Sequence, residues 1–270
     1  MKRIIFLLSF ILFAASCEKL IEWDIDNGSL PFLVVEGKIT NEKKSHIVIL
    51  TRPVNVLNQP PVPASNAIVA ITDNDNVYFL IEFPAGSGIY RTSPSVRGVF
   101  GKQYTLYIQF QNSIFTAKAY MVPVTPLKPL KISESPEQNN LFTIDFQKSD
   151  EPSMIEYYLD WSHLQEYDTL YDGSSRAKLV QYTFNSIDAN EMFKPDQETI
   201  FFPAGTIILR KKYSLTKEYQ EFLRTFLSET EWRGGIFDVL PANVITNLSD
   251  GAVGYFAAST VVSDIMIFYP

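Results

Sequence analysis

Apolar and polar residues alternate in short segments throughout the first half of the chain, which is the pattern of half-buried β-strands. Roughly seven such segments follow one another between residues 33 and 121, separated by Gly, Pro, Asn and Asp. This spacing predicts an immunoglobulin- or transthyretin-like β-sandwich over residues 31–122. The alternation is clearest between residues 103 and 111, where one face of the strand carries Tyr104, Leu106, Ile108 and Phe110.

Three evenly spaced prolines, Pro123, Pro126 and Pro129, follow this region. Because proline lacks an amide donor, they prevent sheet pairing and predict a domain junction within residues 122–128. Residues 128–270 are expected to form a second, β-rich domain of sandwich type, which makes the whole fold mainly all-β. Its strands are expected at 141–147, 155–162, 177–184, 199–202, 206–213, 251–259 and 263–269. Residues 188–194 are consistent with a short helix or a loop.

One segment of the second domain has helical rather than strand periodicity. Its apolar residues recur at the spacing of a single helix face, which predicts an amphipathic helix over residues 216–229 that packs on the second sheet. Thr216 is a suitable N-cap, and Glu218 in the first turn complements the helix dipole. The apolar face consists of Tyr219, Phe222, Leu223, Phe226 and Leu227.

The N-terminus has the layout of a secretory leader, in which two basic residues precede an apolar run over residues 4–15. Small residues follow, and then comes Cys17, the only cysteine of the chain. A cysteine at the cleavage point is the natural attachment site for a diacylglyceryl anchor. We therefore expect a signal peptide at 1–16, lipidation of Cys17, which ties the protein to a membrane, and a charged tether over residues 17–30.

The net charge of the chain is −7, and removal of the leader with its two basic residues makes it −9. An acidic surface disfavours a nucleic-acid partner, since binding to phosphates requires many Lys and Arg side chains. It equally disfavours electrostatic docking on anionic lipid head groups. The acyl chains of the anchor, rather than the protein surface, are therefore expected to hold the protein to the membrane.

Residues suited to catalysis are scarce. The two histidines, His46 and His163, have no partner at a metal-ligand spacing and are expected to be structural or surface residues. The segment Asp73–Asn76 begins like a calcium loop, but Tyr78 stands where the essential glycine would be, so it is interpreted as a hairpin turn. No nucleophile motif, phosphate loop or dinucleotide fingerprint is present. The sequence thus predicts a non-enzymatic protein with no cofactor and no metal.

Two polar segments are candidates for partner contact. One is a proline-rich loop that cannot form a central strand, and the other is a turn rich in Asn, Ser, Asp and Gly. The turn has two interpretations, a structural hairpin or a loop that meets a partner. The candidate contact residues are Asn58, Pro60 and Pro61 in the loop, and Asn247, Asp250 and Gly251 in the turn.

Several short motifs, in order and spacing, resemble a family of Bacteroidota lipoproteins described as domain of unknown function 4249. They lie at residues 33–41, 65–67, 88–90, 98–106, 214–223, 243–247 and 251–256. The resemblance implies an envelope lipoprotein that is frequently encoded beside a TonB-dependent outer-membrane receptor. It implies no known catalytic residues.

Together these observations predict a lipid-anchored protein of the outer membrane, with the leaflet left open, that acts as a non-enzymatic accessory to a TonB-dependent receptor in uptake or capture. The alternative is a stand-alone surface module that binds a glycan or a peptide. The third hypothesis is an enzyme, which the scarcity of catalytic groups disfavours.

Overall fold

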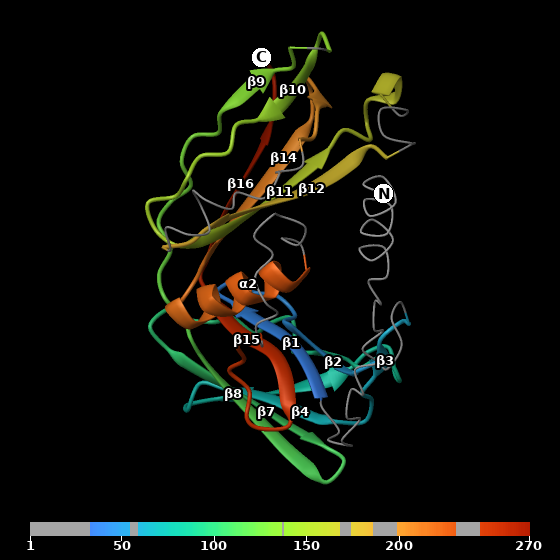
Figure 1. The fold of residues 1–270 in the computed structure, drawn as a ribbon, viewed down its shortest axis with the longest axis vertical. Coiled ribbons are helices and arrows are strands. Elements are labelled where there is room, and N and C mark those ends of the chain that lie inside the picture. The colour runs from blue at the N-terminus through green and yellow to red at the C-terminus, as the bar shows by residue number, and fades with distance from the viewer. Residues whose placement is uncertain (1–32, 55–58, 137, 168–173, 186–198, 231–243) are drawn as a thin grey trace, which may run out of the picture. The chain divides into compact units, whose positions relative to one another are not determined.

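The computed structural model describes residues 33–54, 59–136, 138–167, 174–185, 199–230 and 244–270 (Figure 1). The predicted signal peptide, Cys17, the tether, Asn58 and residues 188–194 lie outside this part of the chain. Strands dominate the described residues and one α-helix accompanies them, which confirms the mainly all-β prediction. Among these residues, none of the helices combines the length and the apolarity that crossing a bilayer would require.

The strands of the N-terminal region lie in a single hydrogen-bonded path, β15-β1-β2-β6-β5-β4-β7-β8, with β3 added on β2. The alternation in the sequence accounts for the strands, because successive side chains point to opposite faces. The strands from this region are β1 (Leu33–Thr40), β2 (Ile47–Arg52), β3 (Val62–Pro63), β4 (Ile68–Thr72), β5 (Val77–Glu82), β6 (Ile89–Arg91), β7 (Gln103–Phe110) and β8 (Ser113–Tyr120).

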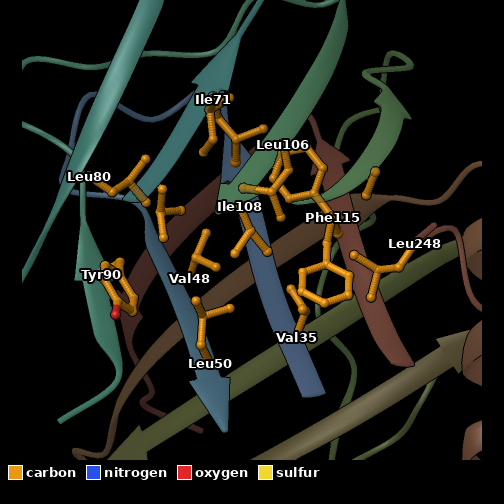
Figure 2. Close-up of a cluster of buried hydrophobic side chains, with 14 of the residues drawn as sticks. Val35, Val48, Leu50, Ile71, Leu80, Tyr90, Leu106, Ile108, Phe115 and Leu248 are labelled. Carbon is orange, nitrogen blue, oxygen red and sulfur yellow. The ribbon is translucent and has the colours of Figure 1, made fainter. Parts of the chain in front are cut away.

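The inner faces of these strands enclose the first hydrophobic core. In Figure 2, Val48 and Leu50 of β2 point toward Ile108 of β7, and Phe115 of β8 lies beside Leu248. Four apolar residues are expected to share one face of β7. Tyr104, Leu106 and Ile108 are buried, and Phe110 is half-buried at the end of the strand. The turn after β4 is the expected hairpin: Asn76 N donates to Asp73 Oδ1 at 2.8 Å.

The strand β15 (Ala252–Ser259) pairs in parallel with β1 along its whole length. This differs from the sequence interpretation, which placed residues 251–259 in the C-terminal domain. The reason is that β15 is apolar on both faces. Phe256 faces the first core, and Tyr255 and Ala257 face a second core, so the strand forms a wall shared by both.

The remaining strands form two further sheets, ordered β12-β11-β14-β16 and β13-β10-β9. A third apolar core lies between these two sheets and includes Trp161, Phe202 and Ile208. The elements are β9 (Ile132–Glu134), β10 (Leu141–Ile144), β11 (Ser153–Asp160), η1 (Gln165–Tyr167), β12 (Arg176–Thr183), β13 (Phe202–Pro203), β14 (Ile207–Ser214) and β16 (Val261–Ile267).

The predicted helix is observed as α2 (Lys217–Thr230). Thr216 caps it, since its Oγ1 accepts a hydrogen bond from Tyr219 N at 3.2 Å. Tyr219, Leu223 and Leu227 are buried in the second core, where the Tyr219 ring stacks on Tyr255 of β15 with 4.9 Å between ring centres. The helix therefore packs on a strand of the nine-stranded sheet and not, as predicted, on the second sheet alone, because β15 leaves the C-terminal strands to pair with β1. The apolar face is narrower than predicted, because Phe222 is half-buried and Phe226 is exposed.

The predicted linker is fixed against the β12-β11-β14-β16 sheet by two buried cations of β14. Arg210 donates to the Lys128 carbonyl at 2.9 Å and pairs with Asp264. Lys212 donates to Thr125 Oγ1 at 2.7 Å. These contacts, together with β15, explain why Phe32–Pro270 forms one compact unit.

Candidate functional site

Several large apolar side chains are exposed on the side of β5, β4, β7 and β8 that points away from the first core. Strand β5 reads Val-Tyr-Phe-Leu-Ile-Glu, and it is apolar on both of its faces. Leu80 points into the core, whereas Phe79 is 67% exposed and Ile81 is 74% exposed. A sheet face that meets water is normally polar, and a strand that is apolar on both faces normally has both faces covered.

Neighbouring strands extend this apolar surface. Ala70 of β4 lies between Phe79 of β5 and Tyr107 of β7, and Ile68 lies opposite Gln109, which in turn lies opposite Ile114 of β8. Phe83, which follows β5, is also exposed. We call this surface the outer face, and define it by Ile68, Val77, Phe79, Ile81, Phe83, Tyr107 and Ile114. Exposed apolar side chains that gather on one face of a sheet mark candidate sites of interaction.

The outer face is also free of negative charge. The outward positions of β4, β5, β7 and β8 are all described, and they include no Asp or Glu and one cation, Lys118. Arg91 of β6 lies opposite Ile81 and donates to the Phe83 carbonyl at 3.4 Å. In a chain with a net charge of −7, a face without carboxylates is a distinct chemical environment.

The outer face does not follow from the alternation of apolar and polar residues, although the sequence contains one signal of it. The run Val77-Tyr-Phe-Leu-Ile81 lacks the alternation of the neighbouring strands, and its position after the Asp73–Asn76 turn by itself predicts only a hairpin partner of β4. Within a sheet, such a run indicates that both faces are apolar.

The predicted contact residues have different environments. Pro60 and Pro61 are exposed beside β3. In the turn, Asn247 is structural: its side-chain amide donates to the Lys118 and Phe256 carbonyls, and its Oδ1 accepts from Phe256 N at 3.0 Å. Gly251 has a positive φ of 86°, which suits glycine, and Asp250 is exposed. A contact role for these residues stays a prediction.

A cluster of polar and charged side chains lies where β11, β12 and β14 meet β1. The Glu156 carboxylate accepts hydrogen bonds from Lys178 Nζ at 2.8 Å, Tyr158 OH at 2.9 Å and Tyr213 OH at 2.7 Å. Burial alone would raise the pKa of Glu156, but these three donors outweigh it and hold the pKa below its ordinary value. Glu156 is therefore an ionised, fully engaged carboxylate. We call Glu156, Tyr158, Lys178, Tyr213 and the nearby Lys38 the junction cluster.

The described residues offer no metal centre, since none of their His, Cys, Asp and Glu side chains gather in a group of three. The two histidines have the structural and surface positions expected of them. His163 is exposed, and His46 is buried with its Nδ1 accepting from Thr40 N at 3.3 Å. The His46 Nε2 atom has no hydrogen-bond partner within the described residues. Burial lowers the pKa of His46, so the folded protein favours the neutral ring.

The stability of the protein should therefore depend on His46 at mildly acidic pH. The unfolded chain has the ordinary histidine pKa of about 6.5 and binds a proton more readily than the folded state. The contribution is thus fully present above this pH and is lost as the pH falls toward the lower, folded-state pKa. We expect His46→Asn, which can still accept from Thr40 N, to show a flatter decline in urea-unfolding free energy between pH 7 and 5. His163→Asn is the control, and an equal effect of both variants would contradict the assignment.

Comparison with models of protein families gives a match over residues 18–265 to the family described as domain of unknown function (DUF4249). The chain belongs to this family. The match spans nearly all of the chain beyond the predicted leader, so the outer face and the junction cluster are both parts of a DUF4249 domain. The resemblance of the sequence motifs is thereby confirmed at the level of the family. No curated protein matches the chain.

Proposed function

We propose that this DUF4249 protein is a Bacteroidota lipoprotein, anchored through Cys17 in the outer membrane, that serves as a non-enzymatic accessory to a TonB-dependent receptor in uptake or capture. The observation that supports this most directly is the outer face. Phe79 and Ile81 are largely exposed on a strand whose composition fits a covered environment. A protein partner that covers the outer face would remove this apolar surface from water, which is the main driving force of association.

The charge pattern supports a protein partner in preference to anionic lipid. Lys118 and Arg91 border an apolar surface that has no carboxylates, which suits a partner with an apolar centre and an acidic periphery. The rest of the chain is strongly acidic and would be repelled by anionic head groups.

The predicted anchor restricts where the partner lies. Sixteen residue steps separate Cys17 from Leu33, where β1 begins. A fully extended chain of that length spans at most about 55 Å, which limits the distance between the anchor and the start of β1. A protein held in this way encounters partners of the same membrane at a high effective concentration, so a modest interface is sufficient.

The experiment is affinity purification of the tagged, full-length protein from gently solubilised membranes, with mass spectrometry of the proteins recovered. We expect a TonB-dependent receptor to be recovered with the native protein. The double variant Phe79→Asp and Ile81→Asp should reduce its recovery by at least about tenfold, because a buried charge in an apolar interface is costly. Stability should change by less than about 1 kcal/mol, since both side chains are exposed.

The matched control is Ile265→Asp, because Ile265 is 68% exposed but lies on β16, in another sheet. It should leave receptor recovery unchanged. Recovery that is unaffected by the double variant would exclude the outer face as the contact. A Cys17→Ser variant that still partitions into detergent would contradict the anchor.

The alternative role, a stand-alone module that binds glycans or peptides, draws support from the aromatic side chains of the outer face, since rings such as Phe79 and Phe83 can stack on sugars. Glycan binding by the purified protein, lost in the same double variant and without any recovered receptor, would favour this role. We expect no hydrolase activity in either case.

A further inference from the structure

Lys38 projects from β1 away from the first core and toward the β12-β11-β14-β16 sheet. Its neighbours Gly37 and Ile39 face the core, so the alternation of the strand points Lys38 outward. The Nζ atom lies 4.6 Å from the centre of the Tyr213 ring, over its face. The side chain is half-buried between the two sheets.

Within the described residues, the Lys38 ammonium group makes no hydrogen bond and no ion pair. The carboxylates of Glu156 and Glu36 are close enough to attract its charge without being hydrogen-bonded to it. Glu156 already accepts three hydrogen bonds, one of them from Lys178. Glu36 lies two residues before Lys38 on the same face of β1 and is exposed, so it also attracts the Lys38 ammonium group. Glu42, which is close to Tyr213, pairs with Lys44 and Lys211.

The hydrogen-bond donors of the Lys38 ammonium group are therefore unused within the described residues, although the carboxylates of Glu156 and Glu36 balance the charges of Lys38 and Lys178. Burial lowers the pKa of Lys38, and the attraction of Glu156 only partly opposes this effect. A half-buried cation with unused donors is stabilised most by an anion that accepts its hydrogen bonds.

We propose that Lys38 is the principal contact of a binding site for the oxyanion of a small ligand, a carboxylate or a phosphate, at the junction cluster. Lys38 donates to the oxyanion from above the Tyr213 ring, and Lys178 adds positive charge at the side of the site. Tyr213 is fixed in place by its hydrogen bond to Glu156, so the surface beneath the Lys38 ammonium is preorganised. The site is separate from the outer face, and its existence does not depend on the proposed receptor.

The test is the binding of inorganic phosphate and of succinate to the purified mature protein, by calorimetry and by thermal unfolding, at constant ionic strength set with NaCl. At about ten times the dissociation constant, we expect one of the two ions to raise Tm by roughly 2–5 °C. The two arms distinguish a phosphate-bearing from a carboxylate-bearing ligand. Lys38→Met should weaken binding by at least about tenfold, and Lys38→Arg should retain it.

The control is Lys43→Met, which removes the same charge from an exposed position in the turn after β1. It should leave the affinity within about twofold, since exposed charges are screened by salt. Equal affinities in Lys38→Met and Lys43→Met, or no effect of either ion on the native protein, would overturn the proposal. Receptor recovery by Lys38→Met should equal that of the native protein, so the failure of one proposal leaves the other intact.

Discussion

Replacing Gly254 by alanine should cause a loss of at least about 3 kcal/mol in the free energy of unfolding. Gly254 lies in β15 with a φ of +102°, where a non-glycine residue is strained. A Cβ atom at this position would lie 2.1 Å from the Val35 carbonyl oxygen of β1. That contact is with backbone, so relief requires the two strands to separate, and the strain and the steric cost add together. Urea unfolding of the purified mature protein measures the loss.

Gly86 provides a matched control for Gly254. It also has a positive φ, +81°, but a Cβ atom there would meet nothing within 4 Å. Gly86→Ala should therefore cost only the conformational penalty of about 1–2 kcal/mol. If Gly254→Ala proved no more destabilising than Gly86→Ala, the close parallel pairing of β15 with β1 would be wrong.

Replacing Lys212 by methionine should destabilise the protein by about 2–3 kcal/mol. The Lys212 side chain is 2% exposed, and its Nζ lies 2.7 Å from Thr125 Oγ1 and 3.1 Å from Glu151 Oε1. Methionine fills the space but leaves the partly buried Glu151 carboxylate without its cation. Since Thr125 belongs to the linker, protease cleavage of residues 122–130 should also become faster under native conditions.

Lys211→Met is the control for this variant. Lys211 is the preceding residue of β14 and points to the opposite face of the sheet, where it pairs with Glu42 at 2.7 Å. Lys211 is 23% exposed, and Glu42 keeps a second cation, Lys44, so the loss of Lys211 should cost about 1 kcal/mol or less, without faster cleavage of the linker. Similar effects of the two substitutions would show that the linker is not held by Lys212.

The local elements of this protein follow closely from its sequence. The alternation in residues 103–111 predicts β7, and the periodicity of 216–229 predicts α2 with Thr216 as its cap. These predictions hold because alternation and helical spacing reflect which face of one element meets a core, and that information lies within a few adjacent residues. The DUF4249 membership could be recognised for a related reason, since its motifs are short and keep their order.

Only the tertiary structure shows which helices and strands pack against one another. The sequence does not show that Ala252–Ser259 pairs with Leu33–Thr40, because parallel pairing joins residues more than 200 positions apart without a local signal. The outer face and the junction cluster depend on the same kind of information. Phe79 is exposed because nothing in the described chain packs over β5, and Lys38 meets Tyr213 because β15 brings the two sheets together. The sequence pattern thus determines which residues are apolar on each face of an element. The packing of distant elements determines which of these residues are buried.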